Sequence, residues 1–204
     1  MTLVLAAGAL AAPAPARSQE LDLSQPITYF VAEGSARSGF RQGYRALAEW
    51  AVQAWAGQAG PAVVVKSAPE GSASIRIYWV SADEGLFGET RARMVGGRFV
   101  ADVFVHPDTD DLGSDIAPSA RKDPLFRDTI VYLTCVHELG HAFGLGHTRA
   151  FADIMYSFQF GGDFVAYFMR FRNQMEKRDD IPRASPFSAA DRNTFRDLVE
   201  ESRR

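Results

Sequence analysis

Residues 137–147 read His137-Glu138-Leu139-Gly140-His141-Ala142-Phe143-Gly144-Leu145-Gly146-His147 and hold three of the four histidines in the chain. Residues four apart on an α-helix lie about 40° apart around the axis and about 6 Å apart along it. His137 and His141 can therefore reach one metal ion from the same face. Gly144 can take a positive φ and bend the chain after the helix, which would return His147 to the same ion. The stretch predicts a metal site with three imidazole ligands.

The ligand set favours a catalytic zinc ion. Three neutral imidazoles leave a fourth coordination position open, whereas structural zinc sites are closed and usually contain several thiolates. The single cysteine, Cys135, lies two positions before His137 and points about 160° away from it around the helix axis. Glu138 projects near the site without having to be a ligand, so we predict that it is the catalytic general base. A lone histidine is usually a core or surface residue, but the eleven-residue pattern is far more specific.

The same eleven residues resemble the extended zinc-binding motif of the metzincin clan of zinc peptidases, and Asp153-Ile154-Met155-Tyr156 is similar to its Met-turn. The resemblance is closest to matrixins and spans roughly residues 25 to 200. It implies an α+β fold, with a twisted, mostly parallel five-stranded sheet, an antiparallel edge strand, a zinc-motif helix, a Met-turn and a C-terminal helix. It also implies that Met155 lies beneath the zinc ion as an apolar floor and is not a ligand.

The chain departs from the matrixin pattern directly after the Met-turn. Ser157-Phe158 stands where matrixins usually have a proline that helps to form the wall of the specificity pocket. The segment from residue 159 to 184 is also longer than a matrixin needs. Its phenylalanines pack a helix onto the lower part of the domain, line or cover the cleft on the side that binds residues after the scissile bond, or contact a partner.

Apolar periodicity outside the motif predicts five strands and four helices. The predicted strands cover residues 27–31, 62–65, 75–80, 89–95 and 98–105, and the predicted helices cover residues 40–55, 128–143, 164–175 and 188–198. Gly96-Gly97 joins the last two strands as a hairpin, and its first arm has the few large apolar residues of an edge strand. Residues 106–122 are rich in Asp, Gly and Pro and predict a loop.

The N-terminal residues predict export. Residues 3–12 form a short apolar run, and Ala14-Pro15-Ala16 fits the small-x-small rule for signal peptidase, although no basic n-region precedes the run. We predict a signal peptide over residues 1–16 and a secreted or periplasmic protein; the alternative is an N-terminal segment with no role in export. Residues 17–204 would form a single catalytic domain, with the zinc cleft between an upper part, about 25–146, and a lower part, about 147–204.

Composition narrows the function classes. A net charge of −3 and an isoelectric point near 5.8 give no basic field for nucleic acid. Apolar runs are shorter than the roughly 20 residues that a membrane span needs, and we expect a monomer. The loop acids Asp108, Asp110, Asp111 and Asp115 could bind calcium, but the spacing of an EF-hand is absent, so the pattern gives calcium no support.

The sequence therefore predicts a secreted zinc-dependent endopeptidase, with His137, His141 and His147 as metal ligands and Glu138 as the base. By the resemblance, an extended peptide or protein substrate would pair with the edge strand near Thr90 to Arg93. Two alternatives remain open. One is a zinc-stabilised binding domain without catalysis, which would have no need of Glu138, and the other is a zinc hydrolase of cell-wall peptides.

Overall fold

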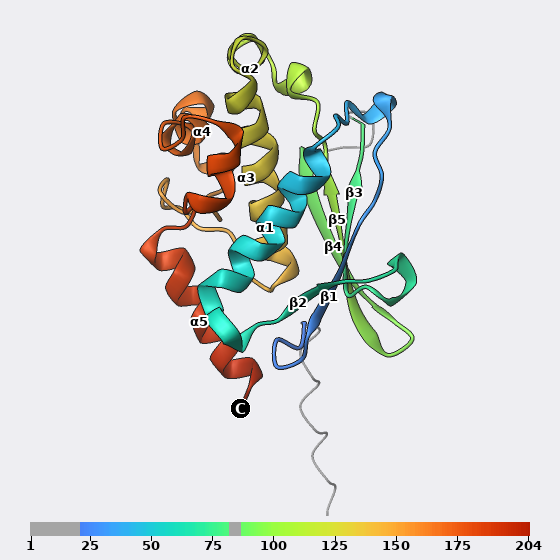
Figure 1. Cartoon of the computed structure of the whole chain (residues 1–204). Coiled ribbons are helices and arrows are strands. Elements are labelled where there is room, and N and C mark those ends of the chain that lie inside the picture. Colours follow the sequence, from blue (N-terminus) through green and yellow to red (C-terminus); the bar gives the residue numbers. More distant parts are fainter. Residues whose placement is uncertain (1–20, 82–86) are drawn as a thin grey trace, which may run out of the picture.

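A computed structural model of the chain describes residues 21–81 and 87–204 and contains a five-stranded sheet (Figure 1). The strands lie in the order β2-β1-β3-β5-β4. Their bounds are β1 Ile27–Val31, β2 Val65–Ser67, β3 Ile75–Trp79, β4 Gly88–Val95 and β5 Arg98–Val105. All neighbouring pairs are parallel except β4 and β5. The predicted α+β fold and mostly parallel sheet with an antiparallel edge strand are confirmed. The predicted signal peptide lies outside the described residues.

The β4–β5 hairpin closes through the two predicted glycines. Gly96 and Gly97 have φ angles of 56° and 78°, and Val95 pairs with Arg98 across the turn. Positive φ at both central residues matches the twist of an antiparallel pair and costs glycine little. Because the hairpin places β4 at the end of the strand order, one edge of β4 has no strand beside it among the described residues.

Five α-helices cover one face of the sheet, with α1 and α3 against the strands and α4 and α5 outside them (Figure 1). Their bounds are α1 Tyr44–Ala59, α2 Ala117–Lys122, α3 Pro124–Ala142, α4 Phe164–Arg172 and α5 Ala189–Ser202. Short 3₁₀ turns are η1 Ala36–Ser38, η2 Gly60–Ala62, η3 Glu70–Ser72, η5 Thr109–Leu112, η6 Phe158–Phe160 and η7 Arg178–Arg183.

Several predicted boundaries were wrong for local reasons. Helix α1 begins at Tyr44 instead of residue 40, because Gly43 has a φ of 99° that no helical residue adopts. Helix α3 begins at Pro124, four residues early, because the Asp123 side chain accepts hydrogen bonds from the backbone of Leu125 and Phe126. Strand β2 lies further along the chain than predicted, since residues 60–62 form a 3₁₀ turn.

The predicted loop at residues 106–122 is partly helical. It contains η5 and then α2, whose first turn includes Pro118. Proline is well tolerated in the first turn of a helix because the N–H that it lacks would be unpaired there. The density of Asp, Gly and Pro therefore marked helix starts as well as turns.

The main core lies between the sheet and the helices, and Trp55 of α1 joins three helices within it. Its indole N–H donates to the backbone oxygen of Val136 on α3 at 2.8 Å. Its ring centroid lies 4.5 Å from that of Phe187, which precedes α5, and 5.0 Å from that of Phe195 on α5. The predicted capping box opens α5, with Ser188 and Asp191 exchanging hydrogen bonds. These contacts hold α3 in a fixed position against both neighbours.

The segment after the Met-turn packs on α3. Phe171 of α4 is buried, and its ring stacks on Tyr132 with centroids 5.5 Å apart. Arg172 Nε lies 2.7 Å from the carboxylate of Asp123 at the start of α3. Arg178 Nε lies 2.9 Å from that of Asp128. The segment thus packs as a helix, and its first turn also lines the cavity described below.

Two further predictions concern the whole chain. Within the described residues, no helix is long and apolar enough to cross a membrane. The division of residues 17–204 into an upper and a lower part with a cleft between them stays a prediction.

Candidate metal centre

The three histidines of the motif converge through their Nε2 atoms. The Nε2 of His147 lies 3.2 Å from that of His137 and 3.1 Å from that of His141. All three ligand atoms lie within 4.8 Å of one another. The structure thus brings together the residues that the sequence predicted as a cluster.

Backbone carbonyls orient two of the three rings. Nδ1 of His137 lies 2.7 Å from the oxygen of Ile154, and Nδ1 of His141 lies 2.8 Å from that of Leu145. Because a carbonyl only accepts, each Nδ1 carries the proton and each Nε2 presents its lone pair. Hydrogen bonds of this kind fix the tautomer of metal-ligating histidines in proteins.

The arrangement fits a zinc ion. Zn–N bonds of about 2.0–2.1 Å at tetrahedral angles would separate ligand nitrogens by about 3.3–3.4 Å, close to the 3.2 Å and 3.1 Å between Nε2 of His147 and those of His137 and His141. Burial lowers the pKa of His137 to about 4 and also lowers that of His141, while their hydrogen bonds to Ile154 and Leu145 act in the opposite direction. Both rings are therefore neutral at neutral pH, which is the form that binds metal.

The bend after α3 forms as predicted. Gly144 has a φ of 103°, its N–H donates to the oxygen of His141 at 3.0 Å, and the next N–H, of Leu145, donates to the oxygen of Gly140 at 2.9 Å. This pair of bonds is the Schellman ending of a helix. The chain then turns back, and Thr148 N donates to Met155 O at 2.8 Å, which fastens the His147 loop to the Met-turn.

Met155 lies buried beneath the histidine helix and touches it through a glycine. A Cβ atom added at Gly140 would overlap the Sδ atom of Met155 and press on Trp55. The absence of a side chain at position 140 is therefore what lets the Met-turn approach α3. The Met-turn is also tied to α5, because the Asp191 carboxylate accepts the Ile154 N–H at 2.9 Å.

Glu138 is buried beside the histidines and faces strand β4. Its side chain contacts Thr90, whose Oγ1 lies 2.9 Å from Oε2 and 2.8 Å from the backbone oxygen of Glu138. A Cβ atom at Gly88 would overlap the same carboxylate. Burial raises the pKa of Glu138 to about 7, although the hydrogen bond from Thr90 lowers it and nearby Glu89 adds to the rise. A carboxyl group that titrates near neutral pH is suited to proton transfer.

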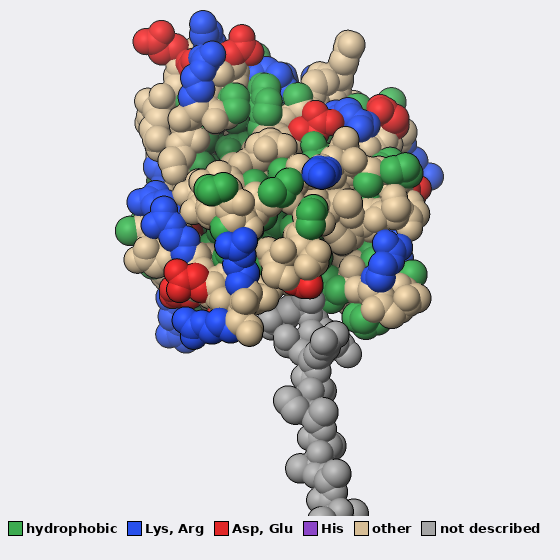
Figure 2. Space-filling view, turned by 60° about the horizontal axis from the view of Figure 1, so that its bottom comes forward, with side chains coloured by type: hydrophobic (Ala, Val, Ile, Leu, Met, Phe, Trp, Pro, Cys, Tyr) green, Lys and Arg blue, Asp and Glu red, His purple; other side chains and the backbone are tan. Residues whose placement is uncertain are grey.

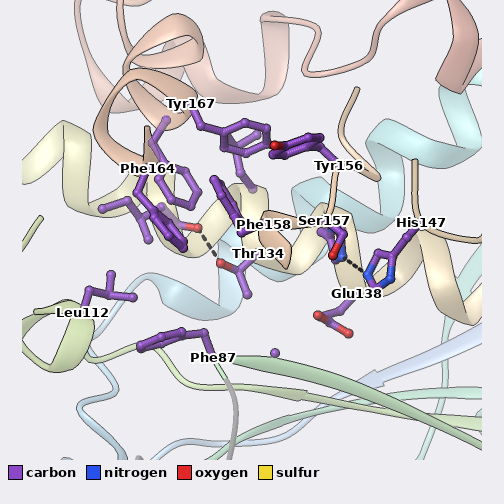
Figure 3. A pocket seen from close by; sticks show the side chains of 15 residues that line it. Phe87, Leu112, Thr134, Glu138, His147, Tyr156, Ser157, Phe158, Phe164 and Tyr167 are labelled. Carbon is purple, nitrogen blue, oxygen red and sulfur yellow. Dashed lines mark hydrogen bonds between the residues drawn. The ribbon is translucent and has the colours of Figure 1, made fainter. Parts of the chain in front are cut away.

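An apolar cavity of about 170 Å³ opens next to Glu138 and His147 (Figure 3). Figure 3 shows it extending from these two residues toward Leu112 at the opposite end. Its aromatic lining residues are Phe87, Tyr156, Phe158, Phe164, Tyr167 and Phe168. The hydroxyl of Tyr156 donates to the oxygen of Gly161 at 2.6 Å, which holds the loop after the Met-turn in place. A cavity of this kind beside a candidate base can accept one apolar side chain.

The fourth histidine, His106, lies outside the cluster and supports the cavity wall. Its backbone N–H donates to Phe87 O at 2.9 Å, and its Nδ1 lies 3.1 Å from Val80 O. Its Nε2 lies 3.2 Å from the Asp111 carboxylate, within ion-pair distance but without hydrogen-bond geometry. His106 thus joins β3, the start of β4 and η5. In the same loop, Asp110 pairs with Arg121 at 2.9 Å, and calcium binding there is untested.

Charged side chains on the face drawn in Figure 2 are dispersed. Basic and acidic groups are scattered among apolar ones on that face, and several basic groups lie near one another at its lower left (Figure 2). This agrees with the small net charge of the chain.

Sequence reasoning missed several residues of the site. Gly88 and Gly140 had no recognisable signal, since each is required to be small only by a side chain from another part of the chain. Thr90 was placed on the edge strand but not next to Glu138. The capping box that contains Asp191 was recognised, yet its bond to the Met-turn is a long-range contact.

Comparison with known proteins agrees with the motif. The sequence profile of the matrixin family matches residues 23–163, more than half of the chain. No curated protein matches at a significant level. Among solved structures, an archaemetzincin from Methanopyrus kandleri is similar over 92% of this chain and 99% of its own, with 14% identity and a TM-score of 0.47. A likeness at that level says nothing about activity.

Proposed function

The chain belongs to the matrixin family and is a zinc metallopeptidase, and on this premise we propose that it is an exported endopeptidase in which Glu138 is the general base. The observation that carries the proposal is the convergence of three histidine Nε2 atoms beside a buried carboxylate at the mouth of an apolar cavity. Structural zinc sites have neither the base nor the cavity.

His137, His141 and His147 would hold the zinc ion through their Nε2 atoms. A bound zinc ion supplies Lewis acidity toward a water molecule and toward the carbonyl of the scissile bond. The backbone oxygens of Ile154 and Leu145 keep two of the rings in the tautomer and orientation that this requires. Met155 closes the site from below as an apolar floor, since it is buried against Gly140.

Glu138 moves the proton. Its carboxylate accepts a proton from the attacking water and then donates it to the nitrogen of the departing amine. Thr90 holds one carboxylate oxygen by its hydroxyl, so the other oxygen is free to face the reacting water. Burial of the carboxyl group brings its pKa into the range in which it can both accept and release a proton.

The substrate lies extended along strand β4. Beyond its pairing with β5, β4 has an edge with no strand beside it among the described residues, and Gly88 and Thr90 place that strand directly against Glu138. An extended peptide can add to such an edge through backbone hydrogen bonds. The side chain that follows the scissile bond then enters the cavity next to Glu138.

The decisive experiment compares the wild type with Glu138→Ala on a mixed peptide library, with zinc content measured in both proteins. We expect cleavage inside peptides by the wild type only, and about one zinc ion per chain in both. Cleavage by both proteins would overturn the role of Glu138. Zinc in both and cleavage by neither would favour a binding domain, and turnover of cell-wall peptides alone would favour the cell-wall hydrolase.

Export and a monomeric state complete the proposal. The residues that support export, the apolar run at 3–12 and Ala14-Pro15-Ala16, predict cleavage after Ala16. Sequencing the N-terminus of the protein recovered from outside the cytoplasm tests this, and an intact residue 1 would contradict it. Light scattering, which measures the molar mass in solution, tests the monomeric state.

A further inference from the structure

Two cavities meet at one wall. The first is the apolar cavity of about 170 Å³ next to Glu138, and the second has about 430 Å³ and contains the acidic residues Asp115 and Asp163. Three residues line both cavities: Phe87, Leu112 and Phe164. In Figure 3 they flank the end of the first cavity that is far from His147, with Phe164 above the opening and Leu112 and Phe87 below it. They therefore form a partition between the two spaces.

We propose that Phe164 is the specificity-determining residue of the site: its ring ends the cavity next to Glu138 and limits the substrate side chain held there to about one benzene ring. The proposal rests on the function proposed above, because it takes that cavity as the place of the side chain after the scissile bond. It adds an upper size limit and assigns that limit to a residue of the segment after the Met-turn.

Phe164 is well held for this role. Its ring stacks on Phe158 with centroids 3.8 Å apart and an interplanar angle of 12°, and Phe158 packs edge-on against Tyr167 at 5.0 Å. Phe164 is also the first residue of α4, where the Asp163 side chain accepts the N–H of Ala166 at 2.9 Å. A capped helix and a stacked ring fix the partition more firmly than a loop side chain would.

The cavity volumes set the expected size limit. An apolar cavity of about 150 Å³ binds one benzene molecule, and the cavity next to Glu138 has about 170 Å³. A leucine or phenylalanine side chain therefore fits, whereas a second ring in line would meet Phe164. Removing the Phe164 ring would join this cavity to the space of about 430 Å³ behind it and admit a longer side chain.

The test uses three peptides that differ only in the residue after the scissile bond: leucine, phenylalanine or 4-phenylphenylalanine. We expect the wild type to cleave the first two with at least about tenfold higher kcat/KM than the third, since steric exclusion of a ring costs more than about 1.4 kcal/mol. Phe164→Ala should raise the kcat/KM of the 4-phenylphenylalanine peptide relative to the phenylalanine peptide by about tenfold or more.

Phe160→Ala is the matched control. Phe160 lies four residues earlier on the same segment, is 42% exposed compared with 41% for Phe164, and is absent from the walls of both cavities. Phe160→Ala should leave the kcat/KM ratio of the 4-phenylphenylalanine and phenylalanine peptides at the wild-type value. A ratio unchanged in Phe164→Ala, or changed equally in both variants, would overturn the proposal. Thermal melting confirms that each variant folds, and the smaller change Phe164→Leu should give an intermediate ratio.

A second measurement does not depend on turnover. In a Glu138→Ala background, calorimetry gives the Kd of the same three peptides with and without Phe164→Ala. Tighter binding of the 4-phenylphenylalanine peptide only when Phe164 is truncated supports the partition, even if the wild type cleaves none of the peptides. In that case the endopeptidase proposal alone would fail. If the wild type cleaves the peptides but Phe164→Ala changes neither the kcat/KM ratio nor the Kd values, the partition would be refuted while the endopeptidase proposal stands.

Discussion

The hydroxyl of Thr90 on β4 lies 2.9 Å from Oε2 of Glu138 on α3, although 48 residues separate them in the chain. The contact joins the edge strand, along which we place the substrate, to the residue that we propose as the base. Neither residue can shift without altering the other.

Thr90→Val should reduce activity while leaving zinc content unchanged. Valine has nearly the shape of threonine but no hydroxyl, so the carboxylate of Glu138 loses the hydrogen bond from the Thr90 hydroxyl. A hydrogen bond to a charged group contributes about 1.5–3 kcal/mol, which corresponds to about a ten- to hundredfold loss in kcat/KM. Thr90→Ser keeps a hydroxyl and should retain most activity; equal kcat/KM for the Val and Ser variants would contradict the role.

Gly144→Ala should weaken zinc binding, and Gly146→Ala should not. Gly144 has a φ of 103°, where a side chain costs about 1–2 kcal/mol, so the bend that returns His147 would be strained. Gly146 has no positive φ and nothing within 4 Å of an added Cβ atom. Competition with a chromophoric chelator measures the zinc Kd of both variants, and identical Kd values would contradict this account of the bend.

Gly140→Ala should destabilise the protein through a clash with Met155. The added Cβ atom overlaps the Met155 sulfur, and overpacking of this kind costs about 1–3 kcal/mol, more than the helix propensity gained from alanine. Met155→Ala removes the clashing atoms, so the double variant should lose less stability than the sum of the two single variants. Urea unfolding of all four proteins tests this, and strict additivity would show that the two residues do not interact.

Asp191→Ala should lower both stability and zinc affinity. The buried carboxylate accepts the N–H groups of Ile154 at 2.9 Å and Ser188 at 2.8 Å, and each unpaired N–H would cost about 1–3 kcal/mol. Ile154 is also the residue whose oxygen orients His137. The control is Asp197→Ala, an exposed residue on the same helix. Denaturant unfolding and zinc titration should show a lower stability and a weaker zinc affinity for Asp191→Ala than for Asp197→Ala. Similar values for both variants would count against the link from Asp191 through Ile154 to His137.

Asp123→Asn should destabilise the protein at neutral pH but not at acidic pH. Burial acts to raise the pKa of Asp123, but hydrogen bonds from Arg172 and from the backbone of Phe126 and Leu125 lower it overall. A lowered folded-state pKa stabilises the fold above the unfolded pKa of about 3.9, and this contribution is lost as the pH falls through the folded pKa.

Asparagine keeps the helix cap and removes only the charge, so the expected loss at pH 7 is about 0.5–1 kcal/mol. Asp123→Ala also removes the cap and should lose about 1 kcal/mol more. Urea unfolding between pH 3 and pH 7 measures the difference between the wild type and Asp123→Asn. A difference that stays constant over this range would show that the ion pair with Arg172 contributes nothing.

The amino-acid sequence alone determined the histidine cluster, the bend and the class of fold. His137 and His141 share a helix face, and Gly144 adopts the positive φ that a sharp turn needs, because both features depend on neighbouring residues. The Gly96-Gly97 hairpin and the capping box at Ser188 are local for the same reason. The predicted starts of α1 and α3 were less accurate, because Gly43 and Asp123 set them. Each acts at a single position, which apolar periodicity does not register.

Only the tertiary structure decided which distant residues complete the site. Thr90 meets Glu138, Gly140 meets Met155, and Phe164 lines a cavity whose other walls come from the start of β4, η5, α3 and the segment after the Met-turn. Such contacts depend on how the sheet and the helices pack, and on volumes shared by segments far apart in the chain. Periodicity along the chain reports which face of an element is buried, but it does not report which partner is buried against it.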